Sequence, residues 1–484
     1  MKYTSTRDTA VSATSARAVI NGISKDGGLF VPKELPSLDY KKLLELNYAA
    51  RADTVLRAFF DFDTDGVSKA AYEDFDEGDP APTVKLDDNL FVLELWHGKT
   101  CAYSDMSLSV LPGLLASAKK SEGNNEKTLV LVASSGDTGE AALEWFRGVP
   151  GTEAVVFYPT EGVGELQRLA MTTLDGDNVC AVAVNGTYGE VQSAVKKAFS
   201  DESLTAALKE KGMEASFANS VNVGSLVPQI ACYFSAYCDL VDSNEIKPGE
   251  KIDFCVPTEF FGSVIAGYYA YKMGLPVNKL ICASNKFDVF ADFIETGVYD
   301  VNRKQSKSNR PSADMLFSSN LERLLFETCG RNGKTIAARA DELSGTGRTQ
   351  VTPKEIEEIR SVFACECADD DAVAAAIEEM FDEYGYLIDT HTAAAYAAAA
   401  ERGLSRKTVV VSGVNPFKCA PAVLTSLGER AKGAVTKEML EDLVDFSAME
   451  IPDRLIELFA KKKRFTDVIE KEGVTAFIKN RFGV

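Results

Sequence analysis

The sequence predicts an α/β protein built on parallel sheets, and two observations favour this class. Short runs of branched, apolar residues recur along the chain, as at 128–133 and 252–256. Each run is followed by a segment whose apolar residues have the spacing of a helix. Strands that alternate with helices of this length form parallel sheets, because two parallel strands need a long crossover connection between them.

The elements can be placed in order along the chain. Strands are expected at 128–133, 154–158, 180–184, 252–256 and 409–411, and helices at 138–146, 166–174, 190–199 and 264–273. Residues 1–90 are expected to form a helical amino-terminal domain, because 10–19 and 40–62 carry apolar residues at helical spacing. The Pro80-Ala81-Pro82 segment then breaks the pattern, and the α/β region is expected over 91–484.

The composition is that of a globular protein and argues against two classes of partner. The chain has 484 residues, of which 45% are hydrophobic, and a formal net charge of −20. An acidic excess repels phosphate backbones and anionic lipids, and no apolar run approaches the ~20 residues of a membrane span. We therefore expect neither a nucleic-acid nor a membrane partner, and a cytoplasmic location. Ten cysteines without a C-x-x-C pair and only two histidines predict reduced thiols and no metal site.

The segment Ser134-Ser135-Gly136-Asp137-Thr138-Gly139 is the first candidate binding site. It directly follows an expected strand and opens an expected helix. Backbone N–H groups at such a helix N-terminus favour a phosphate or a carboxylate. The alternative is a helix start without a ligand, in which Ser135 or Asp137 caps the helix.

Two further segments carry polar groups. The segment 257–263 also joins a strand to a helix, but it contains Glu259, whose carboxylate could itself take the place of an anionic ligand. The segment 97–106 holds His97, one of the two histidines, beside a glycine. A single histidine is more often a hydrogen-bonded structural residue than a catalytic base.

Together, these segments resemble the threonine synthase family of pyridoxal-phosphate enzymes over nearly the whole chain. The matching motifs, in order, include Ser24-Lys25-Asp26-Gly27-Gly28-Leu29-Phe30, Leu93-Glu94-Leu95-Trp96-His97-Gly98, the 134–139 segment, Ala218-Asn219-Ser220-Val221-Asn222, Ser318-Ser319-Asn320-Leu321-Glu322-Arg323 and Asp389-Thr390-His391-Thr392-Ala393. The resemblance implies two open, parallel, twisted sheets flanked by helices, in two α/β subdomains that follow a helical amino-terminal domain. It also implies pyridoxal phosphate as cofactor and O-phosphohomoserine as substrate.

The sequence departs from the family at the residue that carries the chemistry. The family reads His-Gly-Pro-Thr-x-Ala-Phe-Lys-Asp at 97–105, and its lysine forms a Schiff base with the cofactor. This chain has Ser104 at that position. A serine has no amine to condense with an aldehyde. Lys99 is expected to be a surface lysine rather than a replacement, although a turn between the two positions would leave this open.

Three other departures fall on positions that hold the cofactor or the substrate in the family. Its glycine-rich phosphate loop is replaced by Glu259-Phe260-Phe261-Gly262-Ser263, which brings a carboxylate to a phosphate site. Gly413 replaces the residue that partners the pyridine nitrogen, and Ser225 replaces an arginine. Four losses at separated positions argue for natural degeneration rather than a single engineered change. Pyridoxal phosphate is therefore expected to bind weakly or not at all.

These residues predict a threonine-synthase-like protein that has lost pyridoxal-phosphate chemistry but keeps a pocket for a small amino-acid-like anion. The resemblance implies substrate-binding residues at Ser134, Ser135, Gly136, Asp137, Thr138 and Asn222. Two alternatives stay open: an active threonine synthase or related lyase acting on O-phosphohomoserine, and a non-catalytic interaction scaffold. A homo-oligomer or a regulatory partner is compatible with each of them.

Overall fold

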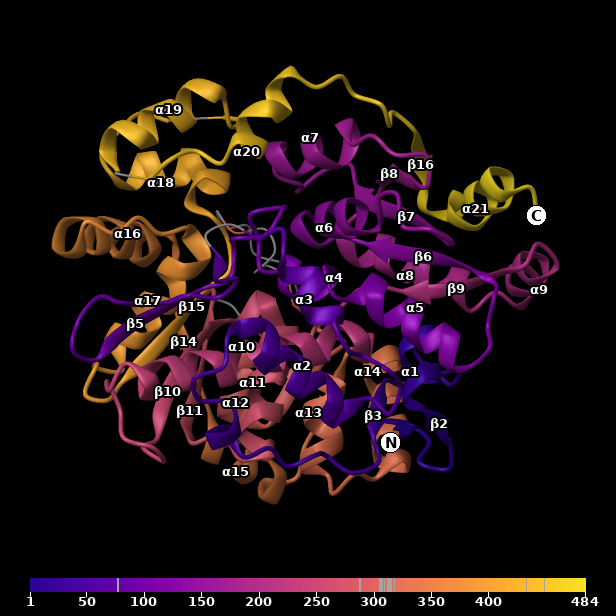
Figure 1. Cartoon of the computed structure of the whole chain (residues 1–484), viewed down its shortest axis with the longest axis horizontal. Helices are drawn as coiled ribbons and strands as arrows, with labels where there is room; N and C mark the ends of the chain where they lie inside the picture. The colour runs from indigo at the N-terminus through magenta and orange to yellow at the C-terminus, as the bar shows by residue number, and fades with distance from the viewer. Residues whose placement is uncertain are drawn as a thin grey trace.

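The fold is of the predicted class. The computed structural model describes residues 1–75, 78–286, 289–303, 308, 310, 316, 318–431, 433–447 and 449–484, with the backbone but not the side chain of Phe260. Two sheets of mainly parallel strands, both flanked by helices, follow an amino-terminal segment. Figure 1 shows the six-stranded sheet at lower left and the five-stranded sheet at upper right.

The six-stranded sheet has the strand order β14-β11-β10-β15-β5-β4. Its strands are β4 (Thr83–Lys85), β5 (Leu90–Glu94), β10 (Ile252–Pro257), β11 (Val277–Ser284), β14 (Phe363–Cys367) and β15 (Thr408–Ser412). All neighbours are parallel except β4 and β5, which are antiparallel. Strand β4 lies before residue 90, β5 begins at that residue and continues to residue 94, and the two strands share one sheet. The division into domains 1–90 and 91–484 stays a prediction.

The five-stranded sheet is entirely parallel, with the order β16-β8-β7-β6-β9. Its strands are β6 (Lys127–Ala133), β7 (Thr152–Pro159), β8 (Val179–Asn185), β9 (Met213–Phe217) and β16 (Val468–Glu470). Strands β6, β7 and β8 are buried along almost their whole length. Burial on both faces of a parallel sheet explains why these strands are continuous apolar runs in the sequence.

Helices connect the strands and cover both sheets. Those up to the end of β9 are α1 (Ser15–Asn21), α2 (Tyr48–Phe59), α3 (Val67–Tyr72), α4 (Asp105–Leu108), α5 (Leu111–Ser121), α6 (Asp137–Phe146), α7 (Glu165–Thr173), α8 (Tyr188–Phe199) and α9 (Glu202–Glu210). The later ones include α10 (Val223–Asp242), η3 (Thr258–Phe260), α11 (Phe261–Met273), α13 (Leu321–Thr328), α16 (Asp370–Tyr384), α17 (Thr390–Glu401), α18 (Ala420–Ser426), α19 (Lys437–Phe446), α20 (Asp453–Glu457) and α21 (Val474–Phe482). Helix α17 packs against four strands of the six-stranded sheet, and α8 packs against β6 and β7.

The amino-terminal segment differs from the expectation of a helical domain. Besides α1, α2 and α3 it contains an antiparallel sheet of order β2-β1-β3, formed by β1 (Lys2–Ser5), β2 (Ala13–Thr14) and β3 (Phe30–Pro32). Strands of two to four residues are too short to show an alternating pattern. Their pairing is therefore not visible in the local sequence, and the helical expectation was incomplete here.

A shared core joins the amino-terminal segment to the rest of the chain. One cluster of buried side chains extends from Tyr3 and Phe59 through α10 and α11 to Val411 of the six-stranded sheet. A second lies against the opposite face of that sheet, and a third lies between the five-stranded sheet, α8 and α21. Burial of apolar surface is the main driving force for folding, so these clusters fix the strand ends that form the site.

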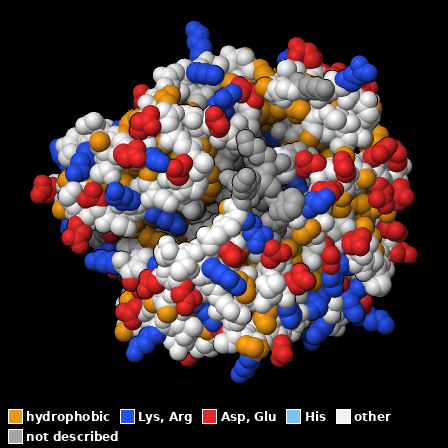
Figure 2. All heavy atoms as spheres, turned by 180° about the vertical axis from the view of Figure 1, so that it is seen from behind, with side chains coloured by type: hydrophobic (Ala, Val, Ile, Leu, Met, Phe, Trp, Pro, Cys, Tyr) orange, Lys and Arg blue, Asp and Glu red, His pale blue; other side chains and the backbone are white. Residues whose placement is uncertain are grey.

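The outer surface is mixed in charge. Acidic and basic side chains intermingle over the face that Figure 2 shows. Within the described residues, no helix is long and apolar enough to cross a membrane. In the same part of the chain, no three His, Cys, Asp or Glu side chains are placed to hold a metal ion. Polar side chains converge instead on a pocket at the ends of the strands.

Candidate functional site

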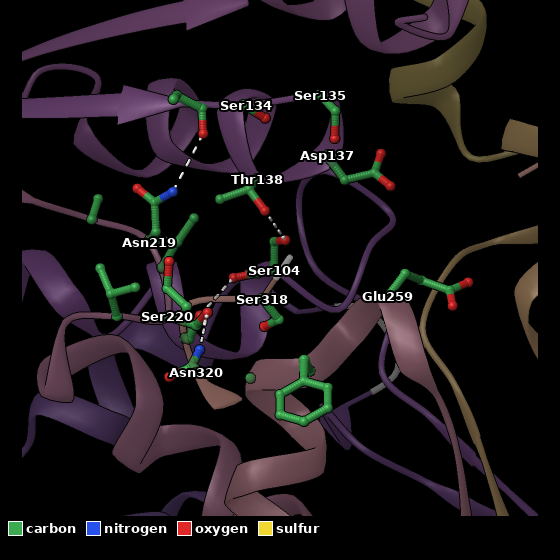
Figure 3. A pocket seen from close by; sticks show the side chains of 18 of the residues that line it. Ser104, Ser134, Ser135, Asp137, Thr138, Asn219, Ser220, Glu259, Ser318 and Asn320 are labelled. Atoms are coloured by element: carbon green, nitrogen blue, oxygen red, sulfur yellow. Dashed lines mark hydrogen bonds between the residues drawn. The ribbon is translucent and has the colours of Figure 1, made fainter. Parts of the chain in front are cut away.

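A polar pocket lies beyond the carboxyl ends of strands from both sheets (Figure 3). It is lined by 134–138 after β6, by 218–221 after β9 and by 318–320, together with Ser104, Gln229 and Glu259. A crevice outside the carboxyl ends of parallel strands is the usual ligand site of open α/β sheets. The charged side chains that line its described part are the two carboxylates of Asp137 and Glu259.

The 134–139 segment forms a rigid start to α6. Ser134 Oγ accepts hydrogen bonds from the backbone N–H of Gly136 at 3.0 Å and of Gly139 at 2.7 Å. A Cβ at Gly139 would lie 2.8 Å from the Ser134 side chain, so that only glycine fits there. Ser134 is thus the structural residue of this segment. Ser135, Asp137 and Thr138 are half-buried and line the pocket.

Asp137 is held in place by a buried lysine that the sequence did not single out. Lys418 is fully buried and pairs with Asp137 at 2.7 Å and with Glu140 at 2.9 Å. Burial alone would lower the pKa of Lys418, but the two carboxylates outweigh it and raise that pKa. Lys418 in turn lowers the pKa of Asp137 against the effect of burial, whereas burial raises the pKa of Glu140 to about 8. Asp137 therefore stays ionised beside the pocket.

Ser104 lies on the pocket wall at the start of α4. Its hydroxyl is within hydrogen-bond distance of the Thr138 hydroxyl, with 3.2 Å between the two oxygens (Figure 3). The residue is 4% exposed. The position that the resemblance gives to the Schiff-base lysine is therefore inside the pocket and faces the α6 segment.

Lys99 does not replace that lysine. Its Nζ pairs with Asp74 at 2.6 Å and lies 4.4 Å from the centre of the Trp145 ring. It lines a different cavity, together with Glu144 and Arg454. The sequence predicted a surface lysine; Lys99 is half-buried and paired, in a cavity other than the Ser104 pocket.

Lys196 is the lysine that touches the pocket rim. Its Nζ donates a hydrogen bond to Ser319 Oγ at 3.0 Å, and Ser319 lines the pocket. Lys196 comes from α8, one turn after Gln192, which also lines the pocket. Burial lowers the pKa of Lys196. Hydrogen bonding to Ser319 places this ammonium beside the 318–320 wall rather than beside Ser104.

Glu259 is paired with the second histidine. It lies in η3 at the end of β10, and its buried carboxylate contacts His391 Nδ1 at the start of α17. Burial alone would raise the pKa of Glu259, but His391 lowers it; burial would lower the pKa of His391, but Glu259 raises it. Figure 3 shows the Glu259 side chain directed away from Ser104 and Thr138. The pair accounts for one Glu259 oxygen, and the other has no partner among the described residues.

Part of the loop after β10 lies directly against the pocket. Phe261 and Gly262 line it, and a Cβ at Gly262 would lie 2.7 Å from the Ser220 side chain. Ser263 lies behind this wall, where its Oγ and backbone oxygen contact the Tyr233 hydroxyl. The side chain of Phe260 lies outside the described part of the chain. The loop thus places the Glu259 carboxylate and the Phe261 ring where the family has a glycine-rich turn.

Two predicted site residues have structural roles. Asn222 is fully buried and caps α10: its Oδ1 accepts from Gly224 N, and its Nδ2 donates to the backbone oxygens of Val19 and Phe217. Gly413 accepts a backbone hydrogen bond from Tyr103 at 2.7 Å. Neither is among the described residues that line the pocket. Asn222 holds α10 in place rather than facing a ligand.

His97 is also a structural residue. Its Nε2 lies 2.7 Å from Glu94 Oε2, its ring stacks on Trp96, and it is 7% exposed. The Tyr386 hydroxyl donates to the other oxygen of Glu94. His97 is thus a hydrogen-bonded structural residue, which is the role that the sequence favoured.

Several pocket residues were missing from the predicted set. Asn219, Ser220 and the 318–320 segment belong to motifs that carried the resemblance, but no ligand role was given to them. Asn320 Nδ2 donates to Ser220 Oγ at 2.8 Å and joins these two walls. Gln229 lies in the first half of α10, and an amide side chain inside the otherwise apolar run 226–232 was the signal that could have identified it.

Known proteins are similar to this chain in sequence and in structure. Two family models match: "Threonine synthase N terminus" over residues 2–72 and "Pyridoxal-phosphate dependent enzyme" over residues 79–414. The crystal structure of a PLP-bound threonine synthase from Brucella melitensis is similar, with a TM-score of 0.85 and 31% identity; the match covers 100% of both chains.

Two relatives are similar in sequence over most of this chain. The threonine synthase of Pseudomonas aeruginosa is 35% identical over 433 residues, which cover 87% of this chain and 90% of that protein. Human threonine synthase-like 1 is 34% identical over 453 residues, which cover 90% of this chain but 61% of that protein. This chain therefore spans less than two thirds of the length of the threonine synthase-like 1 proteins.

Proposed function

The chain belongs to the threonine synthase family, and on that premise we propose that it binds a small amino-acid-like anion without the covalent pyridoxal-phosphate chemistry of the family. The observation that carries this proposal is the absence of an amine at Ser104. Its hydroxyl lies in the pocket beside Thr138, where the family has the Schiff-base lysine. A serine hydroxyl cannot form a Schiff base with an aldehyde.

The lysines near the pocket do not supply a substitute. Lys99 is paired with Asp74 and lines another cavity. Lys418 is buried between Asp137 and Glu140, which raise its pKa and keep it charged, so it is a poor nucleophile. Lys196 is hydrogen-bonded to Ser319 on the rim.

The part of the site that binds the cofactor phosphate in the family does not fit a phosphate group in this chain either. The loop after β10 carries Glu259, which stays ionised because His391 lowers its pKa. A phosphate dianion would lie beside this carboxylate, whose charge His391 offsets in part, and without the glycine-rich backbone that holds the phosphate in the family. The residues present therefore do not fit pyridoxal phosphate as the family holds it. We infer that this chain binds the cofactor weakly or not at all.

The anion-binding part of the pocket supports the second half of the proposal. The 134–139 segment keeps a rigid backbone through Ser134, and α6 begins there with its first-turn N–H groups. Such N–H groups favour a carboxylate. Ser135 and Thr138 add hydroxyl groups beside them. A small carboxylate fits this corner without the cofactor.

An absorbance titration with pyridoxal phosphate tests the proposal. Wild type is compared with the Ser104→Lys, Glu259→Gly double variant. We expect no saturable visible band of a protein-bound Schiff base in wild type, and a saturable band in the double variant. Saturable binding to wild type would reject the proposal. Borohydride reduction and peptide mass spectrometry would then show whether Lys196 or Lys99 supplies the amine of an active lyase.

A further inference from the structure

Gln229 lines the pocket and carries a buried, unpaired acceptor. It lies on α10, is 3% exposed and lines the pocket. Its Nε2 donates to the backbone oxygen of Ser225 at 2.9 Å, which fixes the orientation of the amide because a flipped group would set two oxygens against each other. Its Oε1 has no partner among the described residues and lies 3.5 Å from the place of a Cβ on Gly262.

A second amide oxygen lies on the same pocket without a partner. Asn219 Nδ2 donates to the backbone oxygen of Ala133 at 3.3 Å, while its Oδ1 is buried and unpaired within the described part of the chain. Buried polar atoms are nearly always hydrogen-bonded, so that two unpaired acceptors on one pocket call for a donor other than the described residues, which a ligand can supply.

The surrounding residues indicate the chemistry of that donor. Asp137 and Glu259, the charged side chains of the described lining, are both carboxylates. Ser225 stands where the family has an arginine, and its hydroxyl donates to the Ala218 backbone oxygen rather than to Gln229. Both carboxylates are already paired, with Lys418 and His391, so that the acceptors left to a ligand are the two amide oxygens, and a cationic donor forms the stronger hydrogen bond with such an acceptor. An ammonium group has three N–H donors and no acceptor.

We propose that Gln229, together with Asn219, binds the free ammonium group of an α-amino acid whose carboxylate lies at the N-terminus of α6. This inference rests on the proposed function and names its ligand class. Without a bound cofactor aldehyde, the amino group of the ligand has no partner for a Schiff base and stays charged. The pocket then recognises a zwitterion by its two ends: the carboxylate at the helix start and the ammonium at the two amide oxygens.

Two probes that differ only in the amino group test this inference. O-phospho-L-homoserine and 4-phosphooxybutyrate are titrated into the full chain by isothermal calorimetry without pyridoxal phosphate. We expect the amino compound to bind at least about tenfold more tightly. Equal affinity would show that the two amide oxygens bind only water, and would overturn the inference while the proposed function stands. Binding of neither probe would reject the proposed function and the inference with it.

Variants of Gln229 add a second readout. Gln229→Leu removes one of the two acceptors, and we expect the preference for the amino compound to fall severalfold while 4-phosphooxybutyrate binds as to wild type. Gln229→Glu keeps an acceptor and adds negative charge, but it loses the Nε2 bond to the Ser225 backbone oxygen; in folded protein we expect the preference to be retained or increased. An unchanged preference in Gln229→Leu would overturn the inference. The wild-type comparison decides the question if either variant fails to fold.

Discussion

Lys418 is fully buried beneath the pocket, where it pairs with the carboxylates of Asp137 and Glu140. Its Nζ also donates to the backbone oxygen of Thr100 at 2.7 Å, so all of its donors are used. This arrangement positions Asp137 at the start of α6. The sequence showed Lys418 only as a residue near a proline, because ion pairs between residues far apart in the chain leave no local pattern.

Removal of Lys418 should be costly. In Lys418→Met, Asp137 and Glu140 lose their buried partner, and breaking one side of a buried ion pair typically costs 3–5 kcal/mol, so we expect a loss of about that size. Urea unfolding measures the free energy of unfolding. Lys437→Met, which removes an exposed lysine paired with Glu441, serves as the control and should change stability by less than about 0.5 kcal/mol. Equal effects of the two variants would contradict the assigned role.

The Glu259–His391 pair should make stability depend on pH. The pKa of His391 is raised in the folded state. His391 therefore adds stability that is complete below its unfolded pKa of about 6.5, and this stability is lost as the pH rises through the raised, folded-state pKa. In Glu259→Gln this contribution disappears, since the residue that raises the pKa is gone. We expect the stability difference between wild type and Glu259→Gln to shrink as the pH rises above about 6.5. Parallel urea-unfolding profiles over this range would refute the pairing.

The departures from the family were visible in the sequence because they replace one chemistry by another. Ser104 for lysine and Glu259 for glycine change a functional group, and both residues line the pocket. The pairing of Glu259 with His391 was not predictable, because 132 positions separate the two residues. Asn222 was assigned to substrate by the resemblance, but its motif is explained by hydrogen bonds inside the protein.

Helix α10 is fixed at its start by Asn222. The side chain forms three hydrogen bonds, one to the helix and two to the backbone of Val19 and Phe217. It thereby ties α1 and the end of β9 to the helix that carries Gln229. Asn222 therefore stabilises the start of helix α10 rather than binding a ligand.

Asn222→Ala should therefore destabilise the fold. It leaves two buried carbonyl oxygens without this donor, and we expect a loss of about 1–3 kcal/mol in the free energy of unfolding. Asn47→Ala, which removes a single cap bond from the start of α2, should cost about 1 kcal/mol. We expect the affinity of the folded Asn222 variant for O-phospho-L-homoserine to match that of wild type. A large loss of affinity with normal stability would return Asn222 to the ligand site.

Elements were predictable where a local pattern was long enough. Strand β6 and helix α6 were placed within a residue or two, because a branched run followed by a glycine turn marks both. Strand β16 was not predicted, since its three residues gain their strand structure from β8. Pairing of distant segments depends on tertiary context that propensity does not contain.

The whole molecule combines a complete family fold with an altered site. Both sheets, the amino-terminal segment and the shared core are in place, and the Brucella melitensis enzyme covers the whole chain at a TM-score of 0.85. The sequence predicted the fold class, but not how strand ends from two sheets close a pocket around Ser104. The serine at position 104 in this retained fold is the basis on which we propose a binding function rather than the reaction of the relatives.

Phosphate release from O-phospho-L-homoserine is the measurement that tests this account most directly. The full chain is assayed with and without added pyridoxal phosphate, next to the Ser104→Lys, Glu259→Gly variant and a heat-denatured sample. We predict that wild type releases phosphate no faster than the denatured sample under either condition. Saturable, cofactor-dependent release of phosphate together with threonine formation by wild type would contradict the account.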